Sequence, residues 1–325
     1  MKKAFFYAFM LLFTAFFATS CISKYDVNLP DVEKTLVVNA FLMNDTTEQA
    51  VVQVSQAIST LSNTWSLPDT TKAVVEIFEN GVKLQRLKNV STDLRYYSAE
   101  FVPYKAVNFA PKAGKTYTIS VKMRYFEAVS AEQVMPPDMP TFTTVFHDSL
   151  GVASFGGPLS GKQPVSGVAI SFTDNAATED YYEINAYTQD SVDFGFDGHF
   201  DILNNYLRPA SISSPSTILE QTARGNQGSL LLSDQTINGQ YVNFNILSSD
   251  MGRNIRYENG SPSKVEKRFI RISHLTKDRY LYLKSIQKQQ DSNNSPFSEP
   301  VYVYSNVSSK FGVFLLANGR LQACD

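Results

Sequence analysis

Short runs of apolar and β-branched residues recur along the chain after residue 34 and predict β-strands. In the first part of the chain these runs are residues 35–42, 50–58 and 73–78, with polar, turn-forming residues between them. Asn80-Gly81 follows the third run, and this dipeptide between two strand-like segments is a strong hairpin signal. Further strands are predicted at 82–87, 96–102, 141–146, 168–172, 181–187, 240–247, 267–273, 301–305 and 311–316. No helical period interrupts the runs of the first half, so the pattern favours an all-β fold.

The most diagnostic pattern of the first half is a turn at Gly114, followed by Tyr117 and alternating apolar residues up to Val121. It resembles the start of strand F in immunoglobulin-like sandwiches, where a tyrosine corner forms. Together with the short spacing of the strands, it predicts an immunoglobulin-like β-sandwich over residues 35–135.

A proline-rich segment, residues 136–140, predicts a boundary. Proline cannot sit in a sheet interior and favours a stiff, extended linker. We therefore expect a second β-rich, sandwich-like domain over residues 141–325. It includes one predicted helix at about 276–290, because Thr276 can cap its N-terminus and apolar side chains then recur at helical spacing.

The first 20 residues have the composition of a secretory signal peptide. Two lysines precede an apolar run from residue 4 to 17, which is too short to span a bilayer. Small residues at 18–20 then precede Cys21, as in the bacterial lipobox, although Ala18 stands where leucine is more usual. We predict that Cys21 is lipidated and that residues 21–34 form a polar tether. The alternative is an ordinary secretory signal that ends near a cysteine.

Composition and charge narrow the classes of partner. The chain is 43% hydrophobic and 13% aromatic, which suits a strand-rich globular protein. Its net charge is −2, and removal of residues 1–20 takes away two lysines and no acid, which leaves 27 basic against 31 acidic residues, or −4. This balance gives no reason to expect nucleic acid or a polybasic membrane patch.

The second of the two cysteines, Cys324, lies one residue from the C-terminus. If Cys21 is lipidated, no internal disulfide is possible. We expect Cys324 to lie in a frayed chain end.

No catalytic motif stands out. The histidines are far apart, at His147, His199 and His274, and the chain contains no HExxH pair, Gly-x-Ser-x-Gly elbow, Walker loop or GxGxxG motif. Acidic residues recur every four positions at Asp193, Asp197 and Asp201. Oxygen-rich loops of this kind can hold calcium, but the spacing is not that of an EF-hand, and a turn between two strands is the preferred interpretation. We predict no enzyme activity, no metal and no cofactor.

Three long, weakly patterned segments are the predicted contact loops: 59–71, 151–167 and 211–229. Binding residues concentrate on loops that a rigid scaffold holds. Trp65, the single tryptophan, lies in the first of these segments. Aromatic residues are enriched at interfaces, so Trp65 is the candidate partner contact, although it can equally pack back onto its own sandwich.

Several pieces in this order, behind a lipobox, resemble a lipoprotein family of Bacteroidota catalogued as domain of unknown function 4249. The pieces are residues 174–182, 193–200, 280–283, 294–301, 305–307 and 311–314, of which Pro296-Phe297-Ser298-Glu299-Pro300 and Phe311-Gly312-Val313-Phe314 are the most specific. The resemblance covers nearly all of the mature chain. It implies an outer-membrane lipoprotein of a kind often encoded beside TonB-dependent receptors, and it supplies no catalytic residues. Members often have a longer cysteine-containing tail than the one present here.

These observations leave three functional hypotheses. The first is a non-catalytic accessory binding module, lipid-anchored in the outer membrane and partnered with a TonB-dependent β-barrel transporter in nutrient uptake. The second is a structural or assembly lipoprotein of the cell envelope, and the third is a secreted hydrolase. The missing catalytic motifs argue against the third hypothesis, and the resemblance favours the first hypothesis over the second.

Overall fold

The computed structural model describes residues 35–44, 50–57, 70–92, 98, 100–155, 161–193, 200–202, 207–222, 228–252, 256–258, 261–293, 299 and 301–324. The predicted signal peptide, the tether with Cys21 and the segment with Trp65 lie outside these residues. Within the described part of the chain, no helix is long and apolar enough to cross a membrane.

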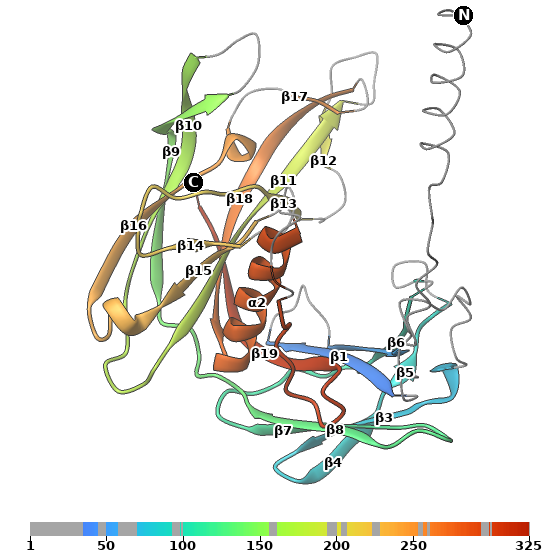
Figure 1. Cartoon of the computed structure of the whole chain (residues 1–325). Helices are drawn as coiled ribbons and strands as arrows, with labels where there is room; N and C mark the ends of the chain where they lie inside the picture. Colours follow the sequence, from blue (N-terminus) through green and yellow to red (C-terminus); the bar gives the residue numbers. More distant parts are fainter. Residues whose placement is uncertain are drawn as a thin grey trace, which may run out of the picture. The chain divides into compact units, whose positions relative to one another are not determined.

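The described strands form three sheets (Figure 1). The main path of the large sheet is β14 (Glu220–Gln221), β15 (Leu230–Ser233), β11 (Tyr181–Asp193), β18 (Ser261–Leu275), β19 (Gly312–Ala323), β1 (Leu36–Met43), β2 (Val51–Gln56), β6 (Val102–Lys105) and β5 (Lys88–Asn89). Three short strands pair beside it: β12 (Phe200–Ile202), β13 (Arg208–Ala210) and β17 (Arg256–Glu258). A second sheet has the order β4 (Val82–Arg86), β3 (Val74–Glu79), β7 (Thr116–Lys122) and β8 (Val129–Val134), and a third β16 (Tyr241–Leu247), β10 (Gly161–Thr173) and β9 (Phe142–Phe155).

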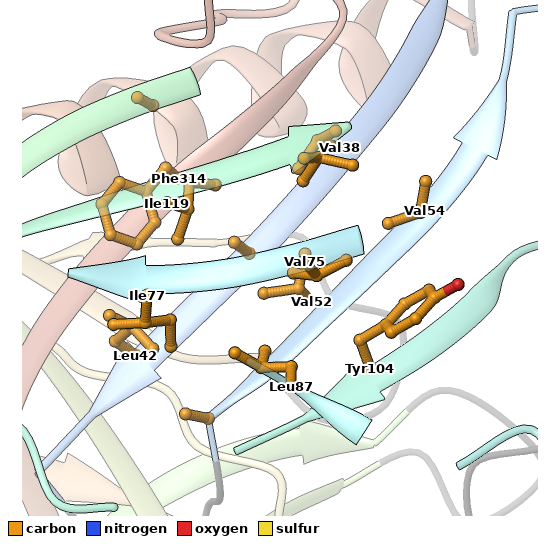
Figure 2. Close-up of a cluster of buried hydrophobic side chains, with 14 of the residues drawn as sticks. Val38, Leu42, Val52, Val54, Val75, Ile77, Leu87, Tyr104, Ile119 and Phe314 are labelled. Atoms are coloured by element: carbon orange, nitrogen blue, oxygen red, sulfur yellow. The ribbon is translucent and has the colours of Figure 1, made fainter. Parts of the chain in front are cut away.

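The first core lies between the second sheet and the β1, β2 and β6 part of the large sheet. Burial alternates along β1 and β3, because successive side chains of a strand point to opposite faces. Figure 2 shows Val38 and Leu42 of β1 gathered with Val75 and Ile77 of β3. This packing confirms a β-sandwich in the first half of the chain.

Tyr117 makes the contact that its sequence context predicts. Its side chain is fully buried, and its hydroxyl accepts the backbone N–H of Lys112 at 2.8 Å and donates to Glu79 Oε2 at 2.7 Å. A bond to the backbone a few residues upstream is the feature of a tyrosine corner. Burial, followed by the Glu79 carboxylate, raises the pKa of Tyr117 to about 12, so the hydroxyl stays neutral and ties the turn to β3.

The second core lies between the third sheet and the β11, β15 and β18 part of the large sheet. Its centre is aromatic, because the rings of Tyr182 and Phe244 meet the ring of Phe172 edge-on, with centroids 5.2 and 6.4 Å away. The molecule therefore contains two sandwiches, as predicted, and both use the large sheet as one of their layers.

β19 belongs to both sandwiches. Residues 312–317 pair in parallel with β1, whereas residues 317–323 pair antiparallel with β18. Phe314 and Leu316 accordingly lie in the first core, and Cys324 lies in the second. The chain from residue 141 onward thus does not stay within the second sandwich, and residues 34–325 form one compact unit. The division into domains at residues 136–140 stays a prediction.

The helix α2 (Lys277–Asn293) confirms the helix predicted at 276–290. The Thr276 hydroxyl accepts the backbone N–H of Arg279 at 3.3 Å, which is the expected N-terminal cap. Leu283 of α2 packs with Tyr181 and Leu275 in a third cluster. Tyr181 and Tyr182 are neighbours on β11, so α2 and the third sheet cover opposite faces of the large sheet.

The predicted strand at 301–305 is absent, because these residues bond to α2 and to their own turn instead of to a sheet. The Tyr304 hydroxyl donates to Asp278 Oδ1 at 2.6 Å, and its backbone N–H donates to the Ser285 hydroxyl at 3.0 Å. The Asn306 amide donates to Asp278 Oδ2 and to the Phe314 carbonyl, each at 2.8 Å. Asp278 in the first turn of α2 therefore holds the segment that leads into β19.

Two further sequence expectations are wrong. Most of the predicted loop 151–167 belongs to β9 and β10. A Cβ at Gly167 would lie 2.3 Å from the Ile246 carbonyl oxygen, so this glycine permits a close approach of strands. Cys324 is 1% exposed and its backbone N–H donates to Arg268 O at 3.0 Å. It is buried because β19 carries the chain end into the second core.

Candidate functional site

A buried acidic network lies where β10 passes into β11. Asp174 directly follows β10 and Asp180 directly precedes β11, so the turn between the strands brings them together. Asp234 joins them from the short 3-10 helix Asp234–Thr236 that follows β15. The three aspartates are 5%, 2% and 2% exposed, and one carboxylate oxygen of each lies within 4.8 Å of the others. Burial of three adjacent carboxylates is costly unless hydrogen bonds or a positive charge compensate.

Tyr182 and His274 provide much of that compensation. The Tyr182 hydroxyl donates to Asp174 Oδ1 at 2.6 Å, and the ring of Tyr182 lies 5.2 Å from that of His274. His274 Nε2 lies 2.9 Å from Asp180 Oδ1. These contacts follow from the register, because Tyr182 on β11 is the direct pairing partner of His274 on β18.

Backbone and hydroxyl donors complete the network. Asp174 Oδ2 accepts the backbone N–H of Gly239 at 2.9 Å, and Asp180 Oδ2 accepts the Thr178 hydroxyl at 2.8 Å. The Asp180 backbone N–H donates to Asp234 Oδ2 at 2.8 Å, and the Asp234 backbone N–H donates to the Asp180 carbonyl at 3.1 Å. The aspartates therefore connect the ends of β10, β11 and β15.

Burial shifts the protonation equilibria of the network toward neutral forms. It raises the pKa of Asp234, and the Asp174 and Asp180 carboxylates raise it further against a backbone hydrogen bond that lowers it. Burial also lowers the pKa of His274, although the Asp180 carboxylate opposes this shift. The pKa of Tyr182 is raised, first by burial and then by its bond to Asp174. Tyr182 is thus a neutral donor at physiological pH.

The spacing of the three carboxylates would allow a shared cation. However, calcium takes about six to eight oxygen ligands, and the oxygens of Asp174 and Asp180 already accept hydrogen bonds. His274 is 4% exposed, so its pairing with Asp180 is out of reach of a substrate in solution. We interpret the network as a structural junction.

We expect Asp234→Asn to raise the free energy of unfolding at pH 7. The raised pKa means that folded Asp234 holds its proton more tightly than unfolded Asp234, whose pKa lies near 3.8. The charged side chain therefore destabilises the fold above the folded pKa, and this penalty fades as the pH falls through that pKa. The advantage of the variant should shrink in acid, which urea unfolding at several pH values would measure.

Asp180→Asn is the matched control. It keeps the shape of the side chain but removes the carboxylate that faces His274, and we expect a loss of about 1–3 kcal/mol. The pH dependence of stability that His274 contributes is opposite to that of Asp234. The pKa of His274 is lower in the folded chain than the unfolded value of 6.5, so stability decreases as the pH falls through 6.5. His274 is present in both the wild type and Asp234→Asn, so the comparison of these two proteins reports on Asp234. Equal losses from both substitutions would contradict a destabilising charge on Asp234.

A second buried polar feature joins α2 to the large sheet. Arg279 Nη2 lies 2.8 Å from Glu183 Oε2, and the two side chains are 6% and 1% exposed. Glu183 lies on the α2 face of β11. It pairs with Leu231 of β15, and Tyr181 and Leu231 belong to the third cluster on that face. This ion pair is therefore enclosed by the sheet and the helix.

The structure does not bring the sequence-predicted site residues together. Cys21 and Trp65 lie outside the described residues, as do His199 and Asp197. Asp193 and Asp201 lie on β11 and β12, which pair antiparallel. The residues between these two strands lie outside the described part of the chain, so the interpretation as a turn stays a prediction. His147 is exposed on β9, whereas His274 is buried in the network.

Sequence reasoning missed most of the acidic network. Asp174, Asp180 and Tyr182 stand close together in the sequence and fall within one of the family-like pieces. Asp234 and His274 are far away along the chain and carry no local pattern. Only strand pairing could have placed them beside the turn.

The fold is all-β: two sandwiches share the large sheet, and α2 covers the other face of that sheet. Buried polar groups join the elements to one another. The family described as "Domain of unknown function (DUF4249)" matches residues 22–320. The chain therefore belongs to this family. No curated protein matches it.

Three solved structures show low similarity. The T6 backbone pilin of serotype M6 Streptococcus pyogenes has 9% sequence identity and a TM-score of 0.21, with 91% of this chain and 65% of the pilin covered. The C-terminal domain of the AgI/II polypeptide BspA of Streptococcus agalactiae has 8% identity and a TM-score of 0.18, with 90% and 99% covered. The M60 catalytic domain of Clostridium perfringens ZmpB with its CBM51 domains has 7% identity and a TM-score of 0.18, with 93% and 40% covered. TM-scores of this size carry no argument about the fold or function of this chain.

Proposed function

We propose that this protein is a non-catalytic lipoprotein of the bacterial outer membrane, anchored through lipids on Cys21. The observation that carries the proposal is the junction at Cys21. A signal-peptide pattern and small residues precede it, and the family match begins at residue 22, directly after it. Two or more acyl chains hold a protein firmly on a bilayer, so such an anchor would hold the two sandwiches at a membrane surface.

A binding role without catalysis has two supports. The described histidine that faces a carboxylate, His274, is enclosed in the second core, whereas a general base must reach its substrate. The acidic network and the Glu183–Arg279 pair each join elements of the fold, which gives both a structural task. We propose an accessory module that works with a TonB-dependent β-barrel transporter in nutrient uptake.

Replacement of Cys21 by serine tests the anchor. We expect Cys21→Ser to move the protein from the membrane fraction to the soluble fraction, because the hydroxyl cannot receive the lipid. The matched control is Cys324→Ser, which removes the other thiol and should leave the protein in the membrane fraction. A Cys21→Ser protein that stays in membranes after a high-salt wash would contradict the anchor.

The transporter partner is tested by recovery from detergent-solubilised membranes. We expect a tagged wild-type chain to recover a β-barrel protein, and Trp65→Ala to recover much less. Truncation of an interface anchor typically costs about 2 kcal/mol or more, roughly a thirtyfold loss of affinity. Unchanged recovery by a folded Trp65→Ala protein would remove Trp65 from the interface. If the wild type recovers no barrel, the structural or assembly lipoprotein becomes the better hypothesis.

A further inference from the structure

One end of the first sandwich is marked by the point at which the chain passes from the tether into β1. Leu36, the first residue of β1, pairs with Gln56 at the end of β2. The Val38 backbone N–H donates to the Phe311 carbonyl at 3.2 Å, and the Ser308 N–H donates to the Ser130 carbonyl at 3.0 Å. The start of β1, the turn 123–128 before β8 and the turn 308–311 before β19 therefore share one end, which we call the tether end.

The tether end exposes two large aromatic side chains. Tyr125 is 82% exposed and Phe311 is 48% exposed. The Arg124 guanidinium lies 4.6 Å from the centroid of the Tyr125 ring, a cation–π contact. Neither aromatic residue contributes to the first core, so the fold itself does not account for their size.

The backbone at this end is unusual for the residues it carries. Tyr125 has a φ of 68° and Lys310 a φ of 62°. The left-handed conformation costs about 1–2 kcal/mol for residues other than glycine, asparagine and aspartate, and glycine would relieve this strain. Residues held in such conformations cluster at functional sites. The turns thus present a bulky aromatic and a basic side chain at an energetic cost.

Basic side chains outnumber acidic ones at the tether end. Among the described residues of the two turns and the last residue of β7, the exposed charges are Lys122, Arg124 and Lys310 against Glu127, three positive minus one negative, or +2. The mature chain as a whole has the opposite sign, at −4 from 27 basic and 31 acidic residues. The fold therefore gathers positive charge at the end where the tether begins.

We propose that the tether end rests on the surface of an anionic phospholipid bilayer, with Tyr125 and Phe311 in the headgroup region and the basic residues on the lipid phosphates. This inference rests on the proposed lipid anchor at Cys21. Fourteen residues, 22–35, separate Cys21 from β1, and a chain of that length spans at most about 50 Å. The anchor would thus keep the tether end within that distance of the bilayer.

The chemistry of this end matches a bilayer surface. Tyrosine is enriched where a membrane meets water, since its ring is apolar and its hydroxyl polar. Basic residues within a Debye length of anionic lipids are attracted to them. The acidic network and the Glu183–Arg279 pair are buried, so neither competes for this surface.

The test uses the lipidated full-length chain in vesicles that contain anionic phospholipid and a headgroup-labelled nitroxide lipid. A fluorophore is attached to Tyr125→Cys or to the control Val107→Cys. Val107 is 46% exposed and lies at the opposite end, since the Ala106 N–H donates to the Ala50 carbonyl beside the start of β2. The two ends are separated by the length of β2, roughly 20 Å.

We expect the loss of fluorescence at position 125 to be at least about twice that at position 107, because interfacial groups reach about 5–10 Å into the headgroup boundary. Charge reversal by Arg124→Glu with Lys310→Glu, in a chain labelled at Phe311→Cys, should bring the quenching down to the level of position 107. Lys112→Glu with Lys115→Glu, on the turn at the start of β7, should leave it unchanged.

Failure of the inference can be told apart from failure of the anchor. Mass spectrometry of the mature chain shows whether Cys21 carries lipid, and a chain without lipid overturns both proposals. A lipidated chain whose labels at 125 and 107 are quenched equally overturns this inference alone. A label at 125 that escapes quenching in pure lipid vesicles but cross-links to a protein in native membranes also overturns it and assigns the tether end to a protein partner.

Discussion

Gly312→Ala is expected to destabilise the protein by more than about 4 kcal/mol, which is exceptional for a single methyl group. Gly312 starts β19 beside Val38 and has a φ of 107°. A Cβ there would lie 2.1 Å from the Val38 carbonyl oxygen and 2.7 Å from its nitrogen. These atoms belong to backbone, so they cannot move aside as a flexible side chain can. The clash would separate β1 from β19, the pair that joins the two sandwiches.

Gly114→Ala is the matched control for this prediction. Gly114 also has a positive φ, 72°, but a Cβ there would meet nothing within 4 Å. Only the strain of the left-handed conformation remains, about 1–2 kcal/mol. Urea unfolding followed by circular dichroism would compare the two variants. Equal costs would show that the close approach of Gly312 to Val38 does not limit stability.

Removal of either partner of the Glu183–Arg279 pair is expected to cost about 3–5 kcal/mol. Glu183→Leu would leave the guanidinium of Arg279 buried against the sheet, and Arg279→Met would leave the carboxylate of Glu183 there. Both side chains are less than one tenth exposed, so water cannot replace the lost partner. Stability of each variant is measured by urea unfolding.

A double-mutant cycle gives this prediction its control. The double variant Glu183→Leu with Arg279→Met removes both charges, and we expect it to be more stable than either single variant, because no unpaired charge remains. The Glu179–Lys277 pair offers an exposed comparison, with side chains 52% and 59% exposed and a distance of 3.3 Å. Glu179→Gln should change stability little, since solvent screens such a pair. Additive losses at Glu183 and Arg279 would show that the two residues do not depend on each other.

Local sequence patterns were sufficient to predict most of the described strands and the helix α2. Strand side chains alternate with a period of two residues and helix side chains with a period of 3.6, so burial of one face leaves a readable trace in the sequence. β1, β3 and β16 follow that trace, and α2 follows its Thr276 cap. The prediction of a bond from Tyr117 succeeded for the same reason, because the hydroxyl and its Lys112 partner are five residues apart.

Local patterns failed where a segment serves a distant partner. Residues 151–167 contain glycines that usually indicate a loop, but Gly167 lies in a strand pressed against the Ile246 carbonyl. Residues 301–305 have the composition of a strand, yet hydrogen bonds to Asp278 and Ser285 hold the segment beside α2. In each case a contact with a remote element overrides local propensity.

The sequence by itself determined the all-β class, the two sandwiches and the helix α2. The tertiary structure alone decided that β19 completes both sandwiches, that Asp234 and His274 join Asp174 and Asp180, and that basic and aromatic side chains gather at the tether end. The physical reason is the distance along the chain between the residues that each kind of contact joins. Side-chain periodicity reports which face of an element is buried, whereas strand order and register set which distant residues meet, and both depend on pairing between segments far apart in the chain.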